Sequence, residues 1–184
     1  MPKIPYDPNY LCFITTVTHK RRPIFRDQKL AERLGTMIMM ACRLKGFVPL
    51  VYAILPDHLH LLVCSQHLLL RTLESVRSNN QTSGEAGGGL FPPLAGPRLS
   101  AVASLPAPQV GALVKSIKGT FSRTLPHGTV WKRRYHCWMI IDGRDAARVV
   151  KYITYNYRHS GVLERYGREP YVWCDDGMIE QILS

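Results

Sequence analysis

Two apolar strand patterns separated by a two-residue turn constrain the fold of this chain most strongly. Residues 47–55 read FVPLVYAIL and residues 58–64 read HLHLLVC, with Pro56 and Asp57 between them. Runs of this length and composition are typical of β-strands, and so short a turn joins strands that pair with each other. We therefore predict an antiparallel β-hairpin over these two runs.

Further patterns on both sides of the hairpin predict the rest of the fold. Apolar and β-branched runs indicate more strands, and apolar residues at helical spacing indicate helices. The order strand, helix, hairpin, helix, strand, helix fits an α+β fold of the ferredoxin-like (RRM-like) kind, an antiparallel sheet with helices packed on one face. The other face would remain open for a strand of nucleic acid. The additional strands are expected at residues 10–18 and 131–141, and the helices at residues 29–45, 110–123 and 142–160.

The chain length of 184 residues suits one domain. We assign this domain to residues 8–165 and expect residues 166–184 to form a C-terminal tail. Residues 78–109 interrupt the domain with repeated Gly, Ala, Ser and Pro and no apolar period. We interpret them as a flexible insertion.

The chain carries a large excess of positive charge. Its 24 lysines and arginines against 13 acidic residues give a formal net charge of +11, which favours a polyanionic partner such as nucleic acid. Basic residues gather beside aromatic ones, and this mixture suits single strands because cations bind phosphates and rings stack on bases. Ordinary solvated surface and a basic membrane-surface protein are the alternatives. The residues expected to bind nucleic acid are Lys20, Arg21, Arg22, Lys115, Lys118, Lys132, Arg133, Arg134, Arg148 and Arg158.

The cysteines and the N-terminus bear on the cellular location. Five cysteines, an odd number, are scattered without a C-x-x-C pair, so we expect reduced core residues in a cytoplasmic protein. The start of the chain lacks the apolar core of a signal peptide, and no apolar run has the length of a membrane span. We therefore predict a cytoplasmic protein without a membrane partner.

The sequence L-P-D-H-L-H-L-L at residues 55–62 carries the first chemical signal. Side chains alternate along a strand, so His58 and His60 should share one face, roughly 7 Å apart at the backbone, while Leu59 turns into the core. Two neutral imidazoles placed in this way can bind one cation. An H-x-H pair alone is weak evidence, because exposed histidines are common on such a face.

A second signal lies in residues 151–159, which read KYITYNYRH. Residues four apart share a face of a helix, so Tyr152 and Asn156 would lie side by side, with Arg148 one turn earlier. A tyrosine attacks phosphorus as phenolate, and with a pKa of about 10 only about 0.1% is ionised at neutral pH, so roughly 4 kcal/mol of help is needed. A divalent cation held by the two histidines and the Asn156 oxygen would supply it and polarise the phosphate. The alternative is an amphipathic helix that buries its tyrosines against the sheet.

In combination, four motifs resemble the single-tyrosine HUH transposases, and most closely their REP-associated tyrosine transposase branch. The motifs are TVTHKRRPIF at residues 16–25, LPDHLHLL at 55–62, WKRRY at 131–135 and YITYN at 152–156 followed by RHSG at 158–161. Tyr157 stands where the family usually has proline, and the family lacks the 78–109 segment.

The resemblance implies a catalytic Tyr152, and a Mg²⁺ or Mn²⁺ ion held by His58, His60 and Asn156. It implies cleavage and rejoining of single-stranded DNA with hairpin structure, such as REP elements, through a 5′-phosphotyrosine intermediate. The chain would act as a monomer or a homodimer. The alternative is a non-catalytic DNA-binding regulator with the same fold, whereas a membrane-surface protein would need a strongly amphipathic basic helix.

Overall fold

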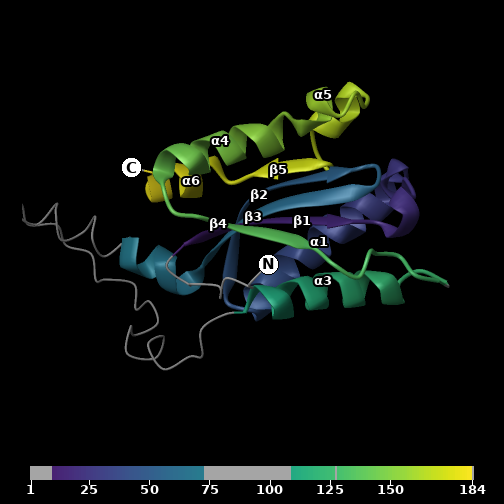
Figure 1. The fold of residues 1–184 in the computed structure, drawn as a ribbon, viewed down its shortest axis with the longest axis horizontal. Helices are drawn as coiled ribbons and strands as arrows, with labels where there is room; N and C mark the ends of the chain where they lie inside the picture. Colours follow the sequence, from purple (N-terminus) through teal and green to yellow (C-terminus); the bar gives the residue numbers. More distant parts are fainter. Residues whose placement is uncertain (1–9, 73–108, 127, 184) are drawn as a thin grey trace, which may run out of the picture.

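The computed structural model describes residues 10–72, 109–126 and 128–183 of the chain (Figure 1). Its centre is a five-stranded antiparallel sheet with the strand order β4-β1-β3-β2-β5. The strands are β1 (Leu11–Val17), β2 (Phe47–Leu55), β3 (His58–Ser65), β4 (His136–Ile140) and β5 (Val172–Cys174). The helices are α1 (Gln28–Leu44), α3 (Val110–Arg123), α4 (Gly143–Thr154), α5 (Asn156–His159) and α6 (Asp176–Leu183), with 3₁₀ turns at His19–Arg21, Ile24–Arg26 and Glu164–Gly167.

The predicted hairpin is confirmed and forms the middle of the sheet. Strand β3 pairs with β2 on one side and with β1 on the other, both antiparallel. The first four strands follow the ferredoxin-like order, in which β1 and β2 run parallel with β3 between them. The α+β fold class predicted from the element order is therefore confirmed.

The first face of the sheet is covered by α1 and α3. Leu34 and Ile38 of α1 and Ile117 and Phe121 of α3 are fully buried there, against alternate residues of the strands such as Leu61. Asp27 caps α1 by accepting a hydrogen bond from the Lys29 amide at 2.9 Å. This face is the main hydrophobic core.

The prediction that all helices lie on one face is wrong for the C-terminal helices. A second buried cluster joins Phe13, Leu50 and Leu62 of the sheet to Ala146 and Ile153 of α4, with α6 packed beside them. Figure 1 shows α4 and α6 on the side of the sheet opposite α1 and α3. The strands β1, β2 and β3 are apolar on both faces, and a second helical layer must cover the part that water would otherwise contact.

The segment expected to be a tail, residues 166–184, instead packs against the domain, because it supplies β5 to the sheet and α6 to the second buried cluster. Strand β5 pairs with β2 through Val51–Cys174, Tyr52–Trp173 and Ala53–Val172. Three residues of strand are too few to give a period-two pattern in the sequence. As a result, β5 covers the edge of β2 and leaves β4 at the other edge.

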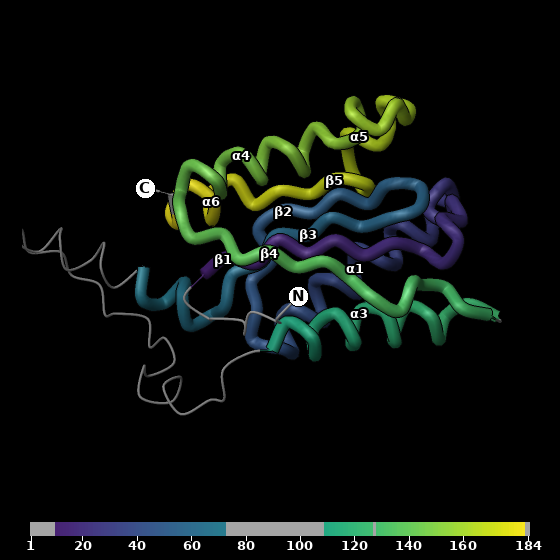
Figure 2. Tube along the Cα trace, in the orientation of Figure 1, coloured from purple at the N-terminus to yellow at the C-terminus, as the bar shows by residue number. Residues whose placement is uncertain are grey.

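The bounds predicted for the strand 131–141 and the helix 142–160 also need correction. Strand β4 begins at His136, and Trp131 contributes only an isolated bridge to Thr18. The predicted helix 142–160 is interrupted at Tyr155, as the turn between α4 and α5 in Figure 2 shows. The Thr154 hydroxyl donates to the Val150 carbonyl oxygen at 3.0 Å, a contact that often bends a helix.

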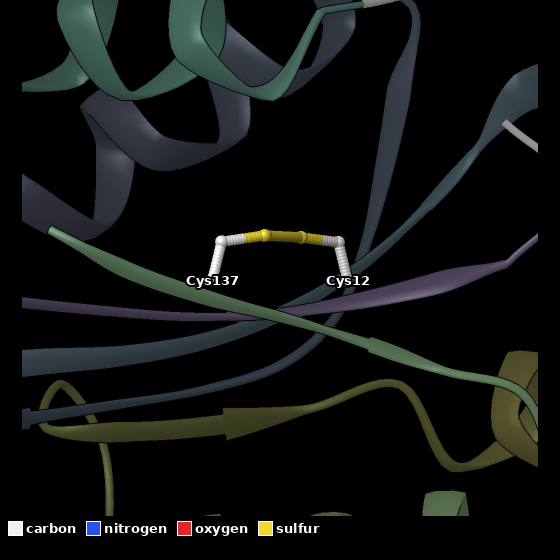
Figure 3. The surroundings of a disulfide bond; sticks show 2 residues. All are labelled: Cys12 and Cys137. Carbon is white, nitrogen blue, oxygen red and sulfur yellow. A yellow bond between two sulfur atoms is a disulfide. The ribbon is translucent and has the colours of Figure 1, made fainter. Parts of the chain in front are cut away.

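The prediction of five reduced cysteines is wrong for one pair. Cys12 of β1 and Cys137 of β4 form a disulfide with their Cα atoms 6.4 Å apart (Figure 3). Their strands are neighbours, but a separation of 125 residues hides this in the sequence. Cys42, Cys64 and Cys174 are free, as predicted.

The flexible insertion predicted at residues 78–109 lies outside the described residues except for Gln109, which precedes α3. A further short helix is seen over residues 66–72. Across the described ranges, no helix combines the length and the apolar character needed to span a membrane.

Candidate active site

The two histidines of β3 lie on the sheet face that α4 covers. Their ring centroids are 4.8 Å apart with the planes at 84°. The intervening Leu59 is buried in the opposite core, as strand alternation predicts. His58 is half-buried and His60 is buried, so the pair lies at the margin of the second layer.

Asp57 fixes the orientation of His58. Its Oδ1 lies 2.6 Å from His58 Nδ1, and its Oδ2 accepts a hydrogen bond from Arg21 at 3.0 Å. Partial burial raises the pKa of the Asp57 carboxyl, but the hydrogen bonds and charges of His58 and Arg21 outweigh it and hold that pKa below its usual range. Because an ionised carboxylate only accepts hydrogen bonds, Nδ1 of His58 donates, and Nε2 would offer its lone pair to a cation when the ring is neutral.

Thr15 fixes the orientation of the His60 ring. Its Oγ1 lies 2.9 Å from His60 Nδ1, because the two residues are direct cross-strand partners on β1 and β3. Burial, and then the charge of His58, lower the pKa of His60 to about 3. His60 is therefore neutral at physiological pH, and its Nε2 is left to accept a ligand when Nδ1 donates to Thr15.

Tyr152 projects from α4 toward these histidines. Its ring centroid is 5.4 Å from that of His60 and 6.1 Å from that of Phe13, in edge contacts. Ile153, the next residue, is fully buried and anchors the helix. The Tyr152 side chain nevertheless remains 42% exposed, so the phenol is accessible from solvent.

Asn156 is buried, at 3% exposed, and begins α5 after the interruption at Tyr155, so the single helix predicted to carry it with Tyr152 is divided. The α5 segment still reaches Tyr152, because the His159 ring centroid lies 6.5 Å from that of Tyr152. The Asn156 Oδ1 accepts a hydrogen bond from the Ser160 hydroxyl at 2.8 Å. Among the described residues, no group of three or more His, Cys, Asp or Glu side chains could hold a metal ion.

A groove of about 780 Å³ runs beside Tyr152 between α4 and the strands β1 and β4. Most of the residues that line this groove could not be predicted from the sequence, because the lining depends on which strands are neighbours in the sheet. Thr15 pairs with both His60 and His136, and Phe13 pairs with Trp138, so these side chains form rows across the sheet. The groove is lined by Phe13, Thr15, His60, His136, Trp138, Ile140, Asp145, Arg148, Val149 and Tyr152.

The basic residues predicted to bind nucleic acid divide between the two sides of the sheet. Arg148 lines the Tyr152 groove and pairs with Asp145 at 3.1 Å. Arg158 and Arg134 are exposed elsewhere, with the Arg158 guanidinium 5.1 Å from the Tyr155 ring centroid. On the α3 side, a groove of about 500 Å³ is lined in part by Lys115, Lys118, Lys132 and Arg133.

Three more of these basic residues, Arg21, Arg22 and Lys118, also have protein partners. Arg21 pairs with Asp57, and Arg22 donates to the Thr129 carbonyl oxygen. Lys118 donates to the Arg133 carbonyl oxygen at 3.4 Å, and its partial burial lowers the pKa of its ammonium. Lys20 is exposed and adopts a left-handed backbone with φ of 53°. Arg21 and Lys118 therefore stabilise the fold as well as adding positive charge.

The described fold was compared with solved structures. The REP-associated tyrosine transposase bound to a REP hairpin superposes with a TM-score of 0.61 at 16% identity, over 94% of this chain and 81% of that one. The chain has the fold of that transposase. A transposase candidate from Deinococcus radiodurans R1 gives a TM-score of 0.42 at 17% identity, over 78% of this chain and 87% of that one, which is too low to argue from. No family model and no curated protein matches the sequence.

The Asp57 contact leads to a first prediction. Asp57→Asn should weaken binding of Mn²⁺ by about 10-fold, because a neutral amide fixes the His58 ring and its basicity less well than a carboxylate does. Isothermal titration with Mn²⁺ measures this change. Glu164→Gln, which removes an exposed carboxylate outside the lining of the Tyr152 groove, is the matched control and should bind Mn²⁺ like the wild type. Equal affinities in all three proteins would contradict a role for His58 as a ligand.

Proposed function

We propose that this chain cuts and rejoins single-stranded DNA, using Tyr152 as the nucleophile. The observation that carries the proposal is the contact between the accessible Tyr152 ring and the buried, neutral His60, with His58 beside it. Residues from a strand and from a helix almost a hundred positions later thus meet on one face of the sheet. The shared fold with a transposase supports a DNA-processing role but does not identify the chemistry.

The two histidines fit a divalent cation such as Mg²⁺ or Mn²⁺. Each Nδ1 is engaged by an oxygen of the protein, Asp57 for His58 and Thr15 for His60, so both rings can offer Nε2. The bound ion would act as a Lewis acid toward a phosphate oxygen. The Asn156 oxygen would complete the ligand set, because its Oδ1 keeps a second lone pair beside the hydrogen bond from Ser160.

The proposed reaction exchanges one phosphate ester for another. The Tyr152 phenol loses its proton, and its oxygen attacks phosphorus to form a 5′-phosphotyrosine. The bond from phosphorus to the 3′ oxygen breaks, and that oxygen takes up a proton to become a 3′-hydroxyl. The reverse attack by a 3′-hydroxyl reseals the strand without an external energy source. Arg148 in the same groove would stabilise the charge on the phosphate.

The substrate we propose is a single strand that carries a hairpin, with the +11 charge favouring the phosphate backbone. The structural neighbour was solved with a REP hairpin, which supports the same class of ligand for this chain. Basic residues line grooves on both sides of the sheet, so two parts of one folded DNA molecule have separate surfaces to contact.

Incubation of the protein with labelled hairpin oligonucleotides and Mn²⁺ tests the proposal. We expect a covalent protein–DNA adduct on a denaturing gel, with a released strand that ends in a 3′-hydroxyl. Removal of the metal with EDTA should abolish the adduct. Tight binding with no adduct on any hairpin, with or without metal, would favour the non-catalytic DNA-binding regulator instead.

A further inference from the structure

Trp138 is the most exposed large aromatic residue among those described, and it lies in the Tyr152 groove. Its side chain is 62% exposed, although it sits on a strand of the sheet beside the candidate active site. An indole left open to water at such a place loses the free energy that burial would give it. The structure therefore raises the question of what covers this ring.

A continuous row of rings connects Trp138 to the nucleophile. The Trp138 centroid lies 5.8 Å from that of Phe13, and the Phe13 centroid lies 6.1 Å from that of Tyr152. Phe13 and Trp138 are cross-strand partners on β1 and β4, so the strand register fixes their contact. Only one phenylalanine separates the exposed indole from the attacking phenol.

Besides the Trp138 ring, the groove contains polar, cationic and apolar side chains that could contact a nucleotide. His136 precedes Trp138 by two positions and points to the same face, since Thr15 and Phe13 are their respective partners. The Arg148 side chain on the opposite wall is 79% exposed, so its guanidinium can contact phosphate. Ile140 and Val149 give the groove an apolar floor. Aromatic faces beside cations are the combination that binds single strands without strict sequence preference.

We propose that Trp138 is the stacking platform for an unpaired base next to the phosphate that Tyr152 attacks. This inference rests on the proposed function for the identity of the ligand, a single strand of DNA. Stacking at this point would hold the adjacent phosphate in front of the phenol and would keep the flanking base out of a duplex. Trp138 is thus a positioning residue that sets affinity and register, and it does not take part in bond exchange.

The test uses the Tyr152→Phe protein, which binds DNA without chemistry, and short unpaired oligonucleotides. Binding should quench the fluorescence of the exposed indole, and Trp138→Leu in the same protein should remove this quenching and raise Kd by about 10-fold to 100-fold. Trp138→Phe should stay within about 3-fold because it keeps an aromatic face. Ile141→Ala, which trims an exposed side chain outside the groove lining, is the control and should leave Kd unchanged.

Oligonucleotides with one abasic position then identify the stacked base. At the correct position, base removal should weaken binding as much as Trp138→Leu does, and the two changes together should add little more. If Trp138→Leu retains the affinity and the quenching, the inference is overturned, whether or not wild type forms an adduct. If wild type forms no adduct but Trp138→Leu still loses affinity, the stacking site stands and the cleavage proposal fails.

Discussion

Tyr152→Phe should eliminate the covalent adduct with hairpin DNA while leaving DNA affinity unchanged. The substitution removes one oxygen and keeps the ring that contacts Phe13 and His60, so folding and groove shape are preserved. Without the phenol oxygen there is no atom to form the phosphate ester, and the expected loss is complete. Denaturing gels of the adduct and fluorescence anisotropy of DNA binding measure the two quantities.

Tyr155→Phe is the matched control for this experiment. The two tyrosines lie three positions apart and are 42% and 41% exposed, so both are almost equally accessible to solvent. Tyr155 contacts the Arg158 guanidinium and does not line the Tyr152 groove. We expect Tyr155→Phe to form adduct at the wild-type rate. An adduct that survives Tyr152→Phe and disappears in Tyr155→Phe would move the nucleophile to Tyr155.

His60→Ala should lower the rate of adduct formation by about 1,000-fold or more at saturating Mn²⁺, because a ligand of the Lewis acid supplies several kcal/mol. His58→Ala should give a loss of similar size. His58 is only half-buried, so its variant also controls for any loss of stability caused by emptying the buried His60 position. Single-turnover rates at a series of Mn²⁺ concentrations measure both effects.

His67→Ala removes an exposed histidine outside this site and should leave the rate unchanged. Thermal unfolding of each variant shows whether the fold is retained. If His58→Ala and His60→Ala both fold, bind DNA and form adduct at the wild-type rate, the histidines have no catalytic part. Adduct formation that is insensitive to metal in every protein would lead to the same conclusion.

The hairpin and the arrangement of its histidines were predictable because they depend on local periodicity. Alternation along β3 is enough to place His58 and His60 on one face and Leu59 on the other. The bounds of α3 coincide with the predicted 110–123 because its apolar positions recur at helical spacing without interruption. The face that Tyr152 reaches was not predictable from the order of elements, which placed every helix on one side of the sheet; only the resemblance to the transposase motifs implied that Tyr152 meets the histidines.

The features that sequence reasoning missed depend on register and on single side-chain contacts. Thr15 and Trp138 belong to the site only because of their partners on neighbouring strands, and one strand cannot reveal its register alone. The break at Tyr155 comes directly after a hydroxyl contact of Thr154 with the Val150 carbonyl, and it places Asn156 in a separate short helix. A helical pattern carries no information about such a local contact. The Cys12–Cys137 bond was missed for the same reason as Trp138.

The short link between β4 and α4 has a consequence for subunit exchange. Pairing with β1 extends to Ile140, and α4 begins at Gly143, so only two residues connect the edge strand to the nucleophile's helix. Two extended residues reach about 7 Å, too little to carry α4 across to the sheet of another molecule while β4 stays in place. The Cys12–Cys137 disulfide also holds β4 to β1. In this structure one polypeptide brings together the Tyr152 phenol and the two imidazoles, and we propose that the reaction proceeds at a rate per molecule that does not depend on protein concentration.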